Sequence, residues 1–342
     1  MLPRSLWSWE TDSGILVAGA GGFIGGHMVR RLVESGYRRV RAVDCKPIRE
    51  WQQVVPGSEH VRLDLREAEA CRQAIRDTRL VFNFASDMGG MGFIENNKAL
   101  CMLSVLINTH LLMAAREEGV ERYFYSSSAC VYAADKQSRS DVIALREEDA
   151  YPAMPEDGYG WEKLFSERLC RHFTEDFGLE TRIARYHNVY GPFGTFDGGR
   201  EKAPAAICRK VISAKLSGTR EIEIWGDGEQ TRSFTYIDDA ITGTCLLTES
   251  DCDEPLNVGS SQLVTINRLV DITESIAGIR LRRKYKLDAP LGVRGRNSDN
   301  TRILRVLGWE PTERLEVGLE RTYRWIHDQI AGRLSLSAAA AK

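Results

Sequence analysis

The sequence lacks three features that would place it in a specialised class of protein. The first is an excess of one charge: 46 Lys and Arg residues face 48 Asp and Glu residues, for a formal net charge of −2. Binding to nucleic acid or to a membrane surface would therefore need a local basic patch, and none is evident. The second is a hydrophobic run of about 18–20 residues that could cross a membrane. We expect a protein that binds neither nucleic acid nor membrane.

The third missing feature is paired cysteines. The eight cysteines occur singly, with no C-x-x-C pair and no His at zinc-finger spacing. Neither a zinc site nor a disulfide framework is expected from such a pattern. The opening segment MLPRSLWSWETDSG also lacks the basic-then-apolar order of a signal peptide. These observations predict a cytoplasmic protein without a metal site.

Short apolar runs alternate with helical patterns in the first half of the chain. The predicted strands are residues 14–18, 40–44, 60–64, 80–85 and 122–128, and the predicted helices include 68–76 and 96–118. Strands that alternate with helices indicate βαβ units and a parallel sheet. The predicted fold is α/β, a Rossmann-type doubly wound parallel sheet with a smaller α/β C-terminal substrate domain.

The pattern changes after about residue 190, where glycine-rich loops precede predicted helices at 203–215, 266–277 and 315–330. We therefore predict two domains with flexible ends. The predicted NAD-binding domain spans 14–190, with part of 230–262 returning to it, and the predicted nucleotide-sugar-binding domain spans 191–330. Residues 1–13 and 333–342 are the expected flexible termini.

A glycine-rich turn between the first strand and the first helix indicates a site for a dinucleotide. Gly19, Gly22 and Gly25 leave backbone N–H groups and a helix N-terminus open to a pyrophosphate. Asp44 ends the next strand, where a carboxylate accepts hydrogen bonds from ribose hydroxyls and disfavours a 2′-phosphate, so NAD is favoured over NADP. By itself, such a turn can also serve only to pack a helix on a sheet. The predicted cofactor contacts are Gly19, Gly22, Phe23, Ile24, Gly25, Asp44, Asp64, Leu65, Ala85, Tyr159 and Lys163.

A tyrosine and a lysine four residues apart suggest redox chemistry at a hydroxyl group. On a helix, Tyr159 and Lys163 share one face, so the ammonium can lower the pKa of the phenol and can hold a ribose. The phenolate can then take a proton from a hydroxyl while hydride leaves its carbon. Ser128, at the end of the strand 122–128, can bond the same oxygen. Taken alone, Y-x-x-x-K is also a common surface pair.

Together these motifs resemble the extended short-chain dehydrogenase/reductases that act on nucleotide sugars, over roughly residues 14–330. Within that superfamily the chain is similar to the GDP-mannose 3,5-epimerase family. Four segments carry this similarity: residues 87–94 (DMGGMGFI), 127–132 (SSACVY), 198–206 (GGREKAPAA) and 292–300 (GVRGRNSDN).

The resemblance implies an isomerase that converts GDP-D-mannose to GDP-L-galactose, and to GDP-L-gulose when C5 alone is inverted. Oxidation of C4 by NAD would acidify the hydrogens on C3 and C5. Cys130 and Lys202 would then exchange them, with Tyr159, Lys163 and Ser128 acting at C4. Before this context is considered, Cys130 could equally be an inert core residue and Lys202 a phosphate contact. The resemblance also implies a homodimer that uses helices 96–118 and 159–177.

Arginine side chains offer a bidentate fork to phosphate, so Arg232 and Arg296 are expected to contact the diphosphate or the guanine. A 4-epimerase or 4,6-dehydratase of another nucleotide sugar is the alternative reaction, and a non-catalytic NAD-binding sensor is the alternative class. The predicted substrate contacts are Met88, Gly89, Gly90, Ser128, Ala129, Cys130, Asn188, Glu201, Lys202, Ala203, Lys210, Gln230, Thr231, Arg232 and Arg296.

Overall fold

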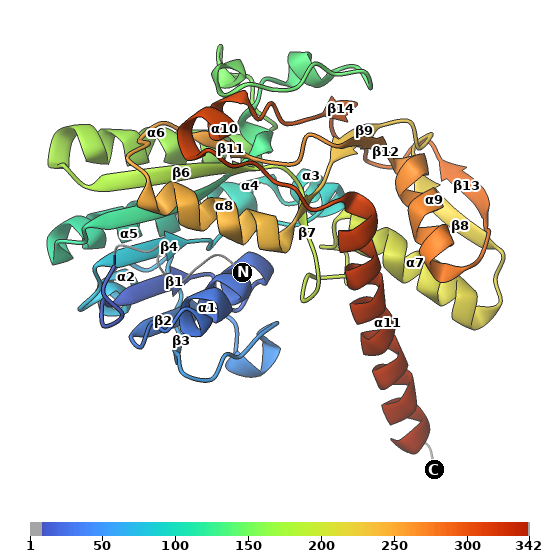
Figure 1. Cartoon of the computed structure of the whole chain (residues 1–342), viewed down its shortest axis with the longest axis horizontal. Helices are drawn as coiled ribbons and strands as arrows, with labels where there is room; N and C mark the ends of the chain where they lie inside the picture. The colour runs from blue at the N-terminus through green and yellow to red at the C-terminus, as the bar shows by residue number, and fades with distance from the viewer. Residues whose placement is uncertain (1–8, 341–342) are drawn as a thin grey trace.

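A seven-stranded parallel sheet forms the centre of the protein (Figure 1). The computed structural model describes residues 9–340, with the backbone alone for 336–340. The strand order is β11-β6-β5-β4-β1-β2-β3, and every neighbouring pair is parallel. The strands are β1 (Ile15–Ala18), β2 (Val40–Asp44), β3 (Glu59–Arg62), β4 (Leu80–Asn83), β5 (Arg122–Ser128), β6 (Glu180–Tyr186) and β11 (Leu256–Val258).

Helices cover both faces of the sheet, and consecutive strand residues point to opposite faces. In β1, Ile15 and Val17 pack with α1 (Phe23–Glu34) and α8 (Ile237–Glu249). Leu16 and Ala18 pack on the other side with α2 (Ala68–Ile75), α5 (Val105–Glu118) and α6 (Tyr159–Phe177). This arrangement explains why the strands are almost continuously apolar in sequence, and it confirms the predicted fold class.

A smaller α/β region lies beside the carboxyl end of the sheet. Its helices α7, α9 and α11 contact one another, and β8 and β13 pair in parallel while β12, β9 and β14 form a second small sheet. The elements of this region are α7 (Ala203–Ser217), β8 (Glu221–Trp225), β9 (Thr231–Ser233), β12 (Leu263–Thr265), α9 (Ile266–Ala277), β13 (Arg282–Lys286), β14 (Gly295–Arg296) and α11 (Leu315–Ala340). The other α-helices and strands of the described chain are α3 (Met91–Asn96), α4 (Lys98–Met102), β7 (Val189–Tyr190), β10 (Thr235–Tyr236) and α10 (Thr301–Leu307).

The single helix predicted over residues 96–118 is two helices in the structure. A turn at Leu103–Ser104 separates α4 from α5. Ser104 is buried there, and its Oγ accepts a hydrogen bond from the backbone N–H of Asp87, at 2.9 Å. Through this hydrogen bond, the turn between the two helices holds Asp87, where the loop of residues 88–90 begins.

The expectation that no segment could cross a membrane was wrong by length and composition. Within residues 9–340, the stretch Lys98–Glu118 is a helical segment long and apolar enough to do so. Its apolar character has a structural cause, because Leu111 and Leu112 are fully buried against the sheet and the neighbouring helices. A helix that lies between a sheet and two other helices needs such a composition for packing alone.

The predicted flexible termini differ from the structure where it describes them. Residues 1–8 and 341–342 lie outside the described part, but Thr11 accepts a backbone hydrogen bond from Arg38 and Ser13 is buried. At the other end, α11 continues to Ala340 and extends beyond the body of the protein (Figure 1). Alanine has the highest helix propensity, so the four-alanine run favours continuation of the helix.

Candidate active site

The predicted site residues gather at the carboxyl edge of the parallel sheet. Gly19 follows β1, Asp44 ends β2, Ala85 follows β4 and Ser128 ends β5. These strands are neighbours in the sheet, so their carboxyl ends lie together. In doubly wound folds, ligands bind at this edge, at the point where the strand order reverses. Here that point is at β1, since β2 and β3 lie on one side of it and β4 and β5 on the other.

The turn between β1 and α1 has no room for side chains. Gly19 has φ +79°, and a Cβ atom there would lie 2.7 Å from the backbone nitrogen of Ala85. A Cβ atom on Gly25 would lie 2.3 Å from the carbonyl oxygen of Gly19. Gly22 precedes the first turn of α1, and no side chain caps that helix. The N–H groups of Gly19 and Gly22 already bond the carbonyls of Val43 and Gly19, so the uncapped N-terminus of α1 is the part of the turn that fits a diphosphate.

Asp44 is tied to the same turn. Its Oδ2 accepts a hydrogen bond from the N–H of Gly21 at 3.1 Å, and the side chain of Lys46 donates to the carbonyl of Gly21 at 2.8 Å. Phe23 and Ile24 form the start of α1 and are partly buried. The acid that should face a ribose is thus held against the glycine-rich turn.

Two further predicted cofactor contacts, Asp64 and Leu65, lie after β3. Hydrogen bonds from Arg66 hold the pKa of Asp64 below its usual value, so this carboxylate is already occupied by an arginine. Leu65 is buried, and its carbonyl accepts a hydrogen bond from the Cys71 thiol at 3.1 Å. A direct contact between Asp64 and adenine would require Arg66 to move.

Tyr159 and Lys163 share one face of α6, as predicted. Tyr159 is the first residue of this helix, and the Lys163 Nζ lies 5.5 Å from the centre of its ring. Both side chains are buried, and Glu162 Oε2 lies 3.6 Å from the same Nζ. Burial raises the pKa of Tyr159 well above its usual value, and the nearby Cys130 and Glu162 add to the rise. The expected lowering of this pKa by Lys163 is therefore outweighed by desolvation.

A turn, and not a continuing strand, brings Ser128 and Cys130 close together. The extended conformation ends at Ser128, and Ala129–Val131 forms one turn of 3₁₀ helix. The Ser128 Oγ caps this turn by accepting a hydrogen bond from the Cys130 N–H at 3.2 Å. The hydroxyl thus both ends the strand and positions the cysteine, which strand periodicity alone did not predict.

Arg296 lies beside Cys130. Its guanidinium donates from Nε to Gln137 Oε1 at 2.6 Å and from Nη2 to Glu156 Oε1 at 2.5 Å. Its Nη1 lies 3.5 Å from the Cys130 Sγ. Arg296 is 4% exposed, and its guanidinium is held among Gln137, Glu156 and Cys130; its expected contact with a diphosphate or guanine stays a prediction.

Lys202 meets this cluster from the small region, as the residue that precedes α7. Burial lowers the pKa of Lys202, although the neighbouring Cys130 and Glu156 partly oppose the change. Burial and Glu156 raise the pKa of Cys130, and Arg296 opposes them. The two predicted exchange residues are therefore brought together, and their surroundings favour the thiol of one and the neutral amine of the other.

Two loops close over this pair. The N–H of Gly90 donates to the carbonyl of Arg200 at 3.0 Å, and a Cβ atom on Gly90 would lie 2.4 Å from the carbonyl oxygen of Glu201. A Cβ atom on Gly89 would lie 2.8 Å from the Cβ atom of Phe93. Met88 packs on the cluster that contains Cys130 and Tyr159. Residues 88–90 and 200–202 thus form one wall of the candidate site.

The other predicted substrate contacts lie farther along the small region. Arg232 is desolvated, which lowers its pKa to about 10, and its guanidinium donates to the carbonyls of Leu291 and Val293. Lys210 is two helical turns from Lys202, about 12 Å along α7, and bonds the Glu223 carbonyl. Ala129 and Ala203 are the chain neighbours of Cys130 and Lys202. The three remaining side chains each donate to a backbone carbonyl: Asn188 to that of Ser233, Gln230 to that of Trp225 and Thr231 to that of Ser140.

Sequence reasoning missed Gln137, Glu156 and Glu162. Gln137 ends a 3₁₀ helix (Ala134–Gln137) and Glu156 lies in an irregular segment; neither carries a periodic pattern, so only the fold brings them to Arg296. Glu162 had a weak signal, because an acid next to Lys163 within Y-x-x-x-K is visible in the sequence. Its Oε1 accepts hydrogen bonds from Tyr125 and Ser166.

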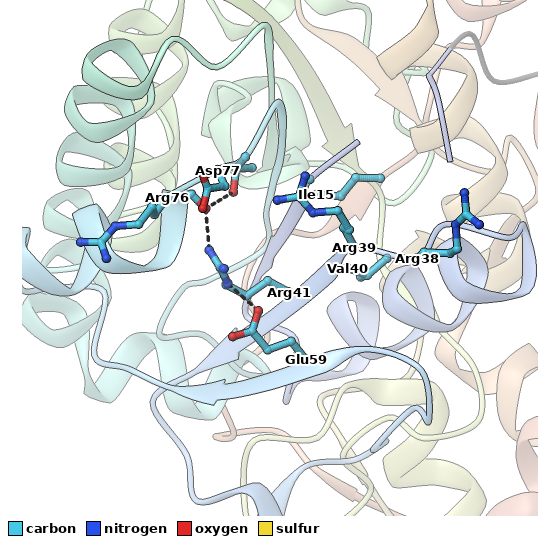
Figure 2. A pocket seen from close by; sticks show the side chains of 10 residues that line it. Ile15, Arg38, Arg39, Val40, Arg41, Glu59, Arg76 and Asp77 are labelled. Carbon is cyan, nitrogen blue, oxygen red and sulfur yellow. Dashed lines mark hydrogen bonds and ion pairs between the residues drawn. The ribbon is translucent and has the colours of Figure 1, made fainter. Parts of the chain in front are cut away.

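A separate pocket lies at the opposite end of the sheet (Figure 2). It is lined by the start of β1 and β2, including Ile15 and Val40, and by several arginines. Arg41 is paired with Glu59 and also bonds backbone carbonyls, so its charge is satisfied. This pocket contains none of the predicted site residues. Within the described side chains, no group of three His, Cys, Asp or Glu residues is placed to hold a metal ion.

Comparison with known proteins identifies the family. Residues 15–259 match the "NAD dependent epimerase/dehydratase family". The chain is 48% identical over 317 residues to GDP-mannose 3,5-epimerase 1 of Oryza sativa subsp. indica, covering 92% of this chain and 82% of the relative. It is 47% identical over 324 residues to GDP-mannose 3,5-epimerase of Arabidopsis thaliana, covering 94% and 84%.

Solved structures with the same fold include UDP-glucose 4-epimerase of Thermotoga maritima with UDP-glucose, at TM-score 0.83 and 26% identity, covering 93% of this chain and 99% of that one. UDP-glucuronic acid 4-epimerase of Bacillus cereus, solved with UDP-glucuronic acid and NAD, has TM-score 0.76 and 25% identity, covering 93% and 99%. The chain therefore belongs to the NAD dependent epimerase/dehydratase family and, within it, to the GDP-mannose 3,5-epimerases.

Proposed function

We propose that this isomerase inverts C3 and C5 of GDP-D-mannose to give GDP-L-galactose, with GDP-L-gulose formed when C5 alone is inverted. The observation that carries the proposal is the meeting of Cys130 and Lys202 beside Tyr159 and Lys163, which offers separate groups for C4 and for its two neighbours. The near-half identity to plant enzymes of that name supports the same substrate.

The chemistry requires C4 to be a ketone before C3 or C5 can lose a proton. When bound, NAD supplies the acceptor for the C4 hydride and later returns it, so there is no net redox change. Gly19, Gly22, Gly25 and Asp44 fit its diphosphate and ribose. Tyr159 acts as the phenolate, which Lys163 stabilises; it accepts the proton of the C4 hydroxyl and becomes the phenol, while Ser128 bonds the same oxygen.

Inversion at a carbon needs one group that removes a proton and another that returns one on the opposite ring face. Cys130 and Lys202 fill these roles in the proposal. Burial shifts Cys130 toward the thiol and Lys202 toward the neutral amine. A group that has accepted a proton in one inversion can return it in the next.

A 4-epimerase or 4,6-dehydratase is the weaker alternative. A dehydratase places an acid close to the strand-end hydroxyl residue to assist elimination at C6, whereas Ala129 and Cys130 follow Ser128 here. A 4-epimerase needs no Cys/Lys pair, although the solved structures of the same fold include 4-epimerases. The two reactions therefore differ in whether C3 and C5 exchange with solvent.

Incubation with GDP-D-mannose in D2O tests the proposal. We expect deuterium at C3 and C5, followed by mass spectrometry and NMR of the sugar. Cys130→Ala should lose this exchange and still reduce bound NAD, as seen in the absorbance of the reduced cofactor. UDP-glucose under the same conditions serves as the comparison substrate. An absence of deuterium in GDP-mannose, with turnover of UDP-glucose, would favour the 4-epimerase.

We also propose that the enzyme works as a homodimer in the cytoplasm. All eight cysteines are free, which suits a reducing compartment. Large apolar side chains are exposed on the adjacent helices α4–α6, where a second copy would cover them. They are Met102, Leu103, Leu106, Met113, Trp161, Phe165 and Phe177.

A further inference from the structure

We propose that Glu156 is a positioning residue that holds Arg296 against Cys130 and thereby controls how firmly Cys130 keeps its proton. The proposal rests on the proposed function, in which Cys130 exchanges a proton with the sugar. Nothing in the sequence motifs pointed to Glu156, which lies in an irregular segment between Pro155 and the start of α6.

Glu156 is fixed to Cys130 through both its backbone and its side chain. Its N–H donates to the carbonyl oxygen of Cys130 at 3.0 Å. Its Oε1 accepts from Arg296 Nη2 at 2.5 Å, while Nη1 of the same guanidinium lies 3.5 Å from the Cys130 Sγ. The carboxylate and the thiol therefore share one arginine, and Gln137 fixes that arginine from a third side.

This arrangement is shielded from water. The side chains of Arg296 and Glu156 are 5% and 10% exposed, and Glu156 Oε2 is enclosed without a hydrogen-bond donor among the described residues. Burial would raise the pKa of Glu156, but the adjacent Arg296 outweighs it, so the pKa is lowered. Glu156 is thus ionised at neutral pH, and charges act strongly at short range in such an environment.

Glu156 and Arg296 act on Cys130 in opposite directions. The other charged or titratable groups that interact with the thiol are Tyr159, Lys202 and Arg232, and Ser128 bonds it. With Glu156 in place, part of the positive charge of Arg296 is neutralised and the thiol is favoured. When the thiol gives its proton to carbon, the S–H bond breaks, a C–H bond forms, and Arg296 stabilises the thiolate left behind.

The test is the pH dependence of Cys130 alkylation by iodoacetamide, resolved by peptide mapping without substrate. Glu156→Gln removes the charge and keeps the shape, so the midpoint should fall by about one pH unit or more. A midpoint lower by one pH unit raises the thiolate fraction at neutral pH about tenfold. Because a thiolate of lower pKa is also a weaker nucleophile, alkylation should accelerate by a smaller factor, about threefold or more. Exposed Cys45 provides an internal reference in the same digest.

Two variants control for charge and for folding. Asp157→Asn removes the same charge from the adjacent, exposed residue that pairs with Lys98, and the Cys130 profile should stay unchanged. Glu156→Asp keeps the charge and should stay close to the parent protein. If Glu156 only maintained packing, Glu156→Gln would speed alkylation at every pH without moving the midpoint, and that result would overturn the proposal.

The deuterium exchange at C3 and C5 gives the second readout. In Glu156→Gln, the part of the pH profile that depends on Cys130 should shift to lower pH in parallel with alkylation. Since alkylation needs no sugar, a shifted alkylation profile without any exchange in the parent protein would reject the proposed substrate alone. An unshifted alkylation profile in a folded Glu156→Gln protein would reject the role of Glu156 alone.

Discussion

Burial is the main influence on the individual side chains of the candidate site. It raises the pKa of Tyr159 and Cys130 and lowers that of Lys202, so it shifts each of the three toward its uncharged form. Sequence motifs identified the three residues, but they suggested a lowered pKa for the tyrosine. The difference arises because the cost of desolvating a phenolate depends on how deeply the residue is buried.

Lys202 provides a prediction at this scale. Because the pKa of its amine is lowered, it loses its proton at a lower pH than an ordinary lysine. Exchange at C3 and C5 should therefore rise with pH through a value below that of free lysine. Lys202→Arg stays protonated and should slow exchange by about 10²–10⁴-fold. Lys215→Arg, on the same helix but bonded to the Ala277 carbonyl, is the matched control and should exchange normally.

Tyr159 provides a second prediction. Tyr159→Phe keeps the buried ring but removes the hydroxyl that accepts the C4 proton, so reduction of bound NAD by GDP-mannose should fall by about 10²–10⁴-fold. Exchange at C3 and C5 should fall with it, since both depend on the ketone. Stopped-flow absorbance and deuterium incorporation measure the two steps. Exchange that survived without C4 oxidation would contradict the proposed order of events.

Among the elements, the turn between β1 and α1 depends most on glycine. Gly25→Ala would place a Cβ atom 2.3 Å from the Gly19 carbonyl oxygen, so α1 would have to move. We expect a loss of about 1–3 kcal/mol in the free energy of unfolding and weaker NAD binding by calorimetry. Gly332→Ala, in the exposed part of α11 with nothing within 4 Å, should instead stabilise the protein slightly. Equal effects of the two substitutions would contradict this account.

Elements with regular periodicity could be predicted closely, and elements that depend on a long-range contact could not. The strands predicted at 40–44 and 122–128 have the same bounds as β2 and β5. The 96–118 helix was wrong as a continuous helix, because the buried Ser104 in the turn bonds Asp87. The turn that presents Cys130 likewise depends on a cap from Ser128 rather than on a pattern of apolar residues.

For the whole molecule, the exposed apolar side chains of α4–α6 predict an assembly. Leu106→Glu combined with Phe165→Glu should shift the protein from dimer to monomer in light scattering coupled to size exclusion, because charges in an apolar interface are costly. Leu287→Glu, an equally drastic change at an exposed residue elsewhere, should leave the mass unchanged. A parent protein that is already monomeric would refute the proposed dimer.

The sequence by itself determined the parallel α/β fold, the glycine-rich turn and the Y-x-x-x-K pair, because each is encoded by local spacing, and the candidate pair Cys130 and Lys202 followed from its resemblance to a known family. Only the tertiary structure decided what surrounds them. It placed Arg296 beside the Cys130 thiol, and it added Gln137 from a 3₁₀ helix and Glu156 from an irregular segment. The strength and direction of a charge interaction depend on distance and burial, and both are fixed only when the chain has folded.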